Sequence, residues 1–198
     1  HLRPQCRQSG EKDEQKKEAV FEATVKLVNE IGFGASSVAK IAREAGVSPA
    51  TIYIYYKNKE DLLVSAYLEI KRRFSRGILS HFDPQLPLRD ALWHLWVNAF
   101  AYIRQNQAHF QFGEQFAATP FHELVDKEEI NGFFRPIFEL LQRGVEQKTI
   151  KPVSRDLLAV YVFYPVMLLA NQKICTGFGC QDADIESAFG MAWDAIKV

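Results

Sequence analysis

Residues 48–59 place hydroxyl, amine and small apolar side chains close together along one short stretch of the chain. Hydroxyls and amines are the donors that proteins set against phosphate oxygens, and small or branched apolar side chains fit base edges and the methyl group of thymine. Helical spacing puts Ile52 and Tyr56 on an inward side and leaves Ala50, Thr51 and Ile54 on the opposite side. This chemistry suits a helix lying in the major groove of DNA, although an ordinary helical hairpin with solvated polar residues shows the same pattern.

Donors for the DNA backbone flank that outward side. The hydroxyls of Tyr53 and Tyr55 and the amine of Lys59 have the right chemistry for phosphate oxygens. Ser37, at the start of the preceding helix, adds a hydroxyl and the free N–H groups of a helix N-terminus. The residues that we expect to contact DNA are Ser37, Ser48, Ala50, Thr51, Tyr53, Ile54, Tyr55 and Lys59.

Three helices must position these side chains. An apolar face along residues 13–30 predicts the first helix, which ends at Gly32. A short second helix follows, and residues 46–48 then form a tight turn with a glycine. Ser48 can cap the third helix, with Pro49 at the first helical position, where its missing N–H costs nothing. Helix, three-residue turn and short helix together predict a helix-turn-helix arrangement.

The composition is that of a folded globular protein. Of 198 residues, 47% are hydrophobic and 24% charged, and this length fits one medium domain or two small modules that share a core. Three cysteines are too few for a disulfide scaffold, so we interpret Cys6, Cys175 and Cys180 as reduced thiols. The longest uncharged apolar run, residues 157–170, is shorter than the roughly 20 residues of a membrane helix. We expect a soluble cytoplasmic protein with no membrane partner and no secretion signal.

The net charge of zero conceals an uneven distribution. Residues 1–76 hold 14 basic against 10 acidic side chains, whereas residues 77–198 hold 10 basic against 14 acidic ones. A basic front half suits a module that approaches a polyanion, and DNA is such a partner.

Helical periodicity continues through the rest of the chain, so we expect an all-α fold in which an N-terminal three-helix helix-turn-helix domain precedes a C-terminal helical domain. The expected organisation is a disordered arm or expression remnant at 1–12, the helix-turn-helix domain at 13–58, a connecting helix at 59–80, and a ligand-binding and dimerisation domain at 81–198. Within this last domain, helices are expected at 87–106, 108–117, 122–147, 154–175 and 182–196.

The C-terminal domain is rich in aromatic side chains at helical spacing. Such a stripe can line a pocket for a flat or apolar ligand, or it can simply fill a core. The candidate pocket residues are Trp93, Trp96, Phe100, Phe112, Phe116, Phe134, Phe138, Tyr161 and Tyr164.

The last two expected helices carry apolar faces that can meet a second copy of the chain in a four-helix bundle. The alternative is that these faces form a monomer's own core. Ala188 and Ala192 are small enough to let two helices approach closely. The candidate dimer residues are Leu158, Val162, Ile185, Ala188, Phe189, Ala192, Trp193 and Ile196.

The stretch from Ser37 to Leu63 closely resembles the DNA-binding signature of the TetR family of bacterial repressors. The matching features are Ile41-Ala42, Ala45-Gly46-Val47-Ser48, Thr51-Ile52-Tyr53, the aromatic pair Tyr55-Tyr56 and Lys59-Glu60-Asp61-Leu62. Two positions depart from the family pattern, which often has His then Phe at the aromatic pair and a polar residue at the position of Ile54. Tyr56 must therefore satisfy a hydroxyl near the core, and Ile54 indicates apolar contact with bases.

The resemblance implies a homodimeric repressor with two reading heads and a C-terminal body that dimerises and holds a pocket for a small-molecule effector. Effector binding would move the fourth helix and change the spacing of the recognition helices. The resemblance also implies phosphate contacts from Ser37, Thr51, Tyr53, Tyr55 and Lys59, with Ala50, Thr51 and Ile54 nearest the bases.

Catalytic and metal chemistry find little support in the sequence. The histidines are scattered, and neither a paired-cysteine motif nor a glycine-rich phosphate loop is present. We expect no enzyme activity, no metal and no cofactor. The alternative is an all-helical enzyme or small-molecule carrier that uses the aromatic body without DNA function.

Overall fold

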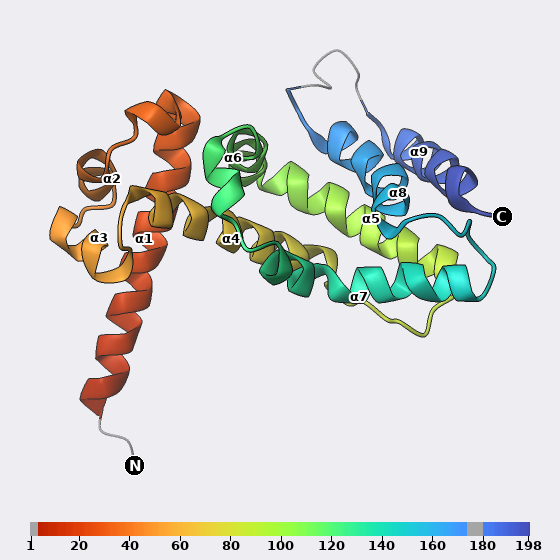
Figure 1. Cartoon of the computed structure of the whole chain (residues 1–198), viewed down its shortest axis with the longest axis horizontal. Coiled ribbons are helices and arrows are strands. Elements are labelled where there is room, and N and C mark those ends of the chain that lie inside the picture. Colours follow the sequence, from red (N-terminus) through yellow and green to blue (C-terminus); the bar gives the residue numbers. More distant parts are fainter. Residues whose placement is uncertain (1–3, 174–179) are drawn as a thin grey trace. The chain divides into compact units, whose positions relative to one another are not determined.

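The structure is a computed structural model that describes residues 4–173 and 180–198, with side chains from residue 10 onward (Figure 1). Its helices are α1 (Pro4–Ala35), α2 (Val38–Glu44), α3 (Pro49–Tyr55), α4 (Lys59–Ile78), α5 (Leu88–Gln105), α6 (Gln107–Ala117), the 3-10 helix η1 (Pro120–Leu124), α7 (Lys127–Glu146), α8 (Arg155–Ala170) and α9 (Asp182–Ile196). The expected all-α fold is confirmed. None of the helices in these residues has both the length and the apolar character that crossing a membrane requires.

Packing divides the chain into two compact units. The first holds the chain up to Ile70 together with Ala108–Val125, and the second holds Lys71–Gln107 together with Asp126–Val198. This division differs from the expected boundary after residue 80, because α6 and η1 pack with the N-terminal helices. Helix α4 contributes its first part to one unit and its last part to the other.

Two expected helix starts differ from those in the structure. Helix α1 begins at Pro4, so residues 4–12, which we expected in a disordered arm, form its first turns instead. The helix expected from residue 122 begins only after Asp126, whose carboxylate accepts a hydrogen bond of 2.9 Å from the N–H of Glu128. This cap defines a new helix start, and the residues before it form η1.

The core of the first unit forms where α1, α2, α3 and the start of α4 meet. We call this cluster the head core; its buried members are Val20, Ala23, Val38, Ile41, Ala42, Ile52 and Leu62. Full burial of each large aliphatic side chain contributes on the order of 2 kcal/mol. Lys26 of α1 also pairs with Glu44 of α2. The head core therefore fixes the short helix α3 against longer neighbours.

Aromatic rings of α6 complete the first unit. Phe116 stacks on Tyr67 with ring centroids 4.3 Å apart, and Phe112 meets Phe33 edge to face at 5.3 Å. Neither Phe112 nor Phe116 has any exposed surface, so no space large enough for water touches them. They fill the core of the first unit, and our expectation that they line a pocket in the C-terminal domain was wrong.

Helices α5, α8 and α9 pack together in the second unit. The indole N–H of Trp96 donates a hydrogen bond of 2.5 Å to the carbonyl of Val162, and Trp96 is fully buried. The ring of Phe189 lies 5.0 Å from that of Trp93 and 5.6 Å from that of Trp96. Through these contacts, one face of α8 and one face of α9 are buried in the core of the second unit. Trp96 therefore fills the core instead of lining a pocket.

Several residues expected at a dimer interface are buried inside this second unit. They are Leu158, Val162, Phe189, Ala192 and Ile196, each at most 5% exposed. A side chain that is buried among its own helices is not available to a partner, so for these residues the expectation was wrong. The other three candidates, Ile185, Ala188 and Trp193, are half-buried against the same core.

Helix α8 turns its opposite face to solvent. We call this face the α8 stripe; its members are Leu157, Val160, Tyr161, Tyr164 and Leu168, which are 43% to 59% exposed. Tyr161 and Tyr164, which we expected to line a pocket, therefore lie on the outer surface. Residues 174–175 of the expected helix, including Cys175, lie outside the described residues, as does the side chain of Cys6, whereas Cys180 is described and half-buried.

Candidate nucleic-acid interface

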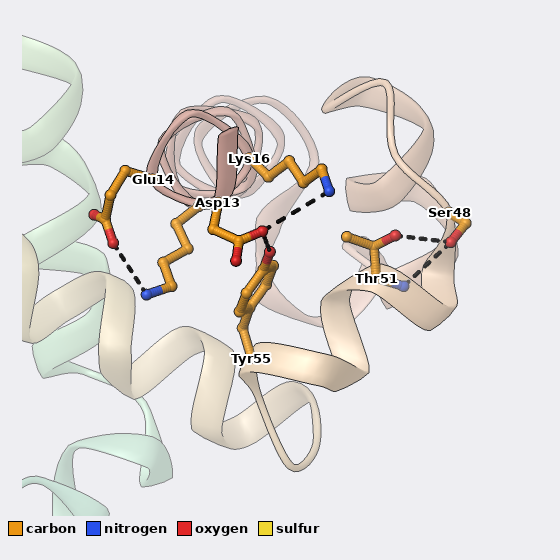
Figure 2. Close-up of polar contacts among 7 residues, drawn as sticks. Asp13, Glu14, Lys16, Ser48, Thr51 and Tyr55 are labelled. Carbon is orange, nitrogen blue, oxygen red and sulfur yellow. Dashed lines mark hydrogen bonds and ion pairs between the residues drawn. The ribbon is translucent and has the colours of Figure 1, made fainter. Parts of the chain in front are cut away.

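Helix α3 begins with a complete local cap, shown in Figure 2. The Ser48 Oγ accepts a hydrogen bond of 3.1 Å from the N–H of Thr51 and lies 2.9 Å from its hydroxyl oxygen. Pro49 follows at the first helical position. Such a cap contributes about 1 kcal/mol. That amount matters because a helix of seven residues is only marginally stable alone.

One side of α3 is buried and the other is exposed. Ile52 is fully buried in the head core, whereas Tyr53 is 55% exposed and Ile54 is 76% exposed. Ala50 is also exposed, and Thr51 is half-buried. An apolar side chain as exposed as Ile54 gains little from packing within the protein. It is therefore free to contact the methyl group of thymine.

Tyr55 is directed at the protein instead of at solvent. Its hydroxyl donates a hydrogen bond of 2.9 Å to Oδ1 of Asp13 in α1 (Figure 2). A phosphate contact from this hydroxyl would require that bond to break. The structure therefore gives Tyr55 a different role from the expected backbone contact.

Lys59 is also engaged within the first unit. Its ammonium donates hydrogen bonds of 2.6 Å to the carbonyl of Phe33 and 3.4 Å to that of Gly34. These carbonyls lie at the C-terminal end of α1, just after Gly32, whose φ of 79° interrupts the helix. A cation is favourable at such an end because the carbonyls there lack helical partners. Lys59 thus caps α1, a pairing that no pattern in the sequence indicates.

Ser37, an expected phosphate contact, and Lys57, which was not expected, complete the set of candidate backbone contacts. Ser37 caps α2 by accepting a hydrogen bond of 3.3 Å from the N–H of Lys40. Lys57 lies two residues after the end of α3 and is exposed, while its backbone N–H donates to Asp61 at 2.8 Å. Lys57 was not among the residues expected to contact DNA, although its position between the aromatic pair and Lys59 is a usable signal. It supplies a positive charge that an approaching phosphate can reach.

Tyr56 was expected to need a way to satisfy its hydroxyl near the core. In the structure it lies at the edge of the head core. Its ring is half-buried and packs against the head core. Burial is the main cause that raises the pKa of its phenol above the ordinary value, with Asp61 adding to the effect. The hydroxyl is therefore held in its neutral form.

Two of the remaining aromatic candidates for a ligand pocket border different hollows of the second unit. Phe138 lies under the guanidinium of Arg155 at 4.3 Å and borders an open hollow of about 530 Å³ along α7. Trp93 borders a smaller hollow of about 260 Å³ with Arg89 and Glu186. Phe100 and Phe134 are half-buried against the core of the second unit.

Two family models match the chain. The model of bacterial regulatory proteins of the tetR family matches residues 20–66, which hold the head core and α3. The model of the tetracyclin repressor-like C-terminal domain matches residues 87–197, more than half of the chain.

Individual relatives agree with these models. A TetR family transcription regulator from Marinobacter aquaeolei VT8 is 34% identical, with a TM-score of 0.83 over 94% of this chain and 98% of that one. An uncharacterized HTH-type transcriptional regulator from Haemophilus influenzae is 24% identical over 91% of this chain and 95% of its own. FadR from Bacillus subtilis, solved in complex with stearoyl-CoA, has a similar fold, with a TM-score of 0.68, 21% identity and coverage of 89% and 95%. With its capped and outward-facing α3, this chain belongs to the TetR family of helix-turn-helix transcriptional regulators.

Proposed function

We propose that this regulator is a homodimeric repressor that leaves its operator when a small apolar molecule binds. The observation that carries the proposal is the exposed pair Tyr53 and Ile54 on a short helix that is capped and buried on its other side. Such a helix presents fixed side chains to a major groove.

The DNA contacts that we propose differ in part from those implied by the motif. Ala50, Thr51 and Ile54 face the bases, and the hydroxyl of Tyr53 meets the backbone. Lys57, which is exposed, replaces Lys59 as the cation nearest a phosphate. Tyr55 and Lys59 are occupied by hydrogen bonds within the first unit.

The α8 stripe supports a second copy of the chain as partner. Its members recur at helical spacing, and five large apolar side chains in one exposed row form the kind of patch that monomers seldom carry. A two-fold dimer would bury the stripe of each copy against the same surface of the other. It would also supply the two reading heads that a palindromic operator requires.

An apolar effector is supported by the similarity to FadR. That protein has been solved with stearoyl-CoA, a ligand with a long apolar tail, and the body of this chain shares its helical fold. Release needs only that the effector bind more tightly to a conformation whose two heads cannot reach both half-sites.

Fluorescence anisotropy with the DNA upstream of the chain's own gene tests the proposal. We expect saturable binding by a dimer, weakened by salt, and release on addition of stearoyl-CoA or another apolar compound from a panel. Tight operator binding by a monomer would contradict the dimer. Binding that no compound of the panel affects would contradict the proposed apolar effector.

A further inference from the structure

Tyr55 is held between two side chains of α1. In addition to its hydrogen bond with Asp13, its ring lies 5.5 Å from the ammonium of Lys17. Lys16 forms a longer ion pair of 3.9 Å with the same carboxylate oxygen of Asp13. Figure 2 shows Asp13 lying between Lys16 and Tyr55. We call Asp13, Lys17 and Tyr55 the α1–α3 clamp.

The C-terminal end of α3 depends on this clamp. Ser48 caps the helix at its start, and Ile52 anchors its middle in the head core. After Tyr55 the chain leaves the helix, because Tyr56 has an extended conformation with φ of −131° and ψ of 133°. The clamp thus attaches the last turn to a residue 42 positions earlier in the chain. Tyr56, the next residue, packs against the head core. Without the clamp this contact alone would hold the end of α3, and Tyr53 and Ile54 would be held less firmly in their direction.

The charge of Asp13 also opposes a phosphate at the hydroxyl of Tyr55. A phosphate bound there would bring a second negative charge beside the carboxylate, and like charges at such a short distance repel each other even in water. The hydrogen bond to Asp13 is the main cause that raises the pKa of Tyr55, so the phenol remains a proton donor at neutral pH. Both effects favour the clamp over a backbone contact.

We propose that Asp13 is a positioning residue for operator binding, which holds Tyr55 on α1 so that Tyr53 and Ile54 face the groove while Tyr55 makes no phosphate contact. The proposal rests on the proposed function, since its main readout is the binding of an operator.

Four variants and one control test the clamp. Asp13→Ala removes both the acceptor and a charge, Asp13→Asn keeps an acceptor oxygen, and Tyr55→Phe removes the donor. The double variant Asp13→Ala with Tyr55→Phe completes a cycle. Glu11→Ala is the matched control, because Glu11 is an exposed acidic residue of the same helix and is not the acceptor for Tyr55.

The readout is the ratio of operator affinity to affinity for a random duplex, which cancels the general effect of removing a negative charge. We expect this ratio to fall about three- to tenfold in Asp13→Ala and in Tyr55→Phe, the size of effect that loss of one ordinary hydrogen bond produces. The double variant should fall no further than either single one. Asp13→Asn and Glu11→Ala should keep the ratio of the unmodified chain.

If Tyr55 contacts a phosphate directly, Asp13→Ala should change operator binding in the opposite direction. In that case Tyr55→Phe weakens operator binding, Asp13→Ala strengthens it relative to Glu11→Ala, and this pattern overturns the proposal. An unchanged ratio in Asp13→Ala also overturns it. Thermal unfolding shows which variants fold, and if Asp13→Ala does not, Asp13→Asn and Tyr55→Phe carry the comparison.

If the unmodified chain binds no operator, the proposed function fails while the clamp remains testable. Thermal unfolding of the same cycle then measures the coupling between Asp13 and Tyr55. Coupling supports the clamp, and strictly additive losses of stability overturn it.

Discussion

Lys59 Nζ lies 2.6 Å from the carbonyl oxygen of Phe33, so the first residue of α4 caps the end of α1. We predict that Lys59→Ala lowers the free energy of unfolding by about 1 kcal/mol, since it leaves a helix end without its cationic partner. The slope of log affinity against log salt concentration should stay nearly unchanged if, as we propose, Lys59 Nζ remains on these carbonyls and binds no phosphate. Chemical denaturation and anisotropy at several salt concentrations measure the two effects.

Lys57→Ala is the matched control and should behave in the reverse way. Its exposed side chain leaves stability unchanged when removed, whereas the salt slope should become shallower by about 0.9 for each phosphate that is no longer neutralised. If Lys59→Ala flattens the slope and keeps full stability, Lys59 binds a phosphate after all.

Ile54 should read a base. Ile54→Ala is expected to relax the preference at one operator position, where the partner is a thymine methyl, at a cost on the order of 1 kcal/mol. Tyr53→Phe should weaken binding to all sequences alike, because its hydroxyl meets the backbone. Selection from a random library distinguishes the two, and an unchanged motif from Ile54→Ala would contradict the assignment.

The α8 stripe and the core of the second unit predict different outcomes for the same kind of substitution. Tyr164→Asp should give a folded monomer with weak operator binding, because a charge is placed in the proposed interface and the avidity of two linked heads is lost. Phe189→Asp should unfold the second unit, since Phe189 is buried against Trp93 and Trp96. Analytical ultracentrifugation with circular dichroism separates these results. A folded dimer from Tyr164→Asp would place the interface elsewhere.

Gly144 and Gly132 of α7 differ in the space around them and so allow a matched test of packing. A Cβ added at Gly144 would lie 2.5 Å from Leu88 Cδ2 and 3.0 Å from Ile150 Cδ1, whereas at Gly132 it would meet nothing within 4 Å. Gly144→Ala should therefore destabilise the second unit by about 1–3 kcal/mol through overpacking. Gly132→Ala should be neutral or stabilise it by up to about 1 kcal/mol, because alanine favours the helix. Equal midpoints of thermal unfolding for the two variants would refute the close approach at Gly144.

Tyr56 should make the first unit sensitive to alkali. Because burial raises its folded-state pKa above the ordinary 10.0, the neutral phenol stabilises the fold fully below pH 10.0, and this stability is lost as the pH rises through the folded pKa. Tyr56→Phe should leave stability near pH 7 unchanged and reduce the loss above pH 10. Tyr53→Phe, at an exposed position, should keep the alkaline profile of the unmodified chain. Urea titrations at pH 7 and above pH 10 provide the comparison.

Most helices and the outward face of α3 could be predicted from local sequence, because both depend on neighbours a few residues apart. The cap from Ser48 to Thr51 spans three residues, Pro49 can serve only near a helix start, and Ile52 with Tyr53 and Ile54 follows from helical spacing alone. The motif that these residues form was sufficient to identify the family, which the matches over residues 20–66 and 87–197 confirm.

The packing of the helices was needed to establish which apolar faces are buried and which polar groups are already paired. Helix α8 is apolar all round, so periodicity could not show whether Val162 or Tyr161 faces inward; the hydrogen bond from Trp96 to the Val162 carbonyl and the packing of α9 decided it. Lys59 and Tyr55 have the chemistry of phosphate donors, but their partners lie 26 and 42 residues away in the sequence. Contacts over such separations depend on how the helices pack, and no local pattern of residue types records them.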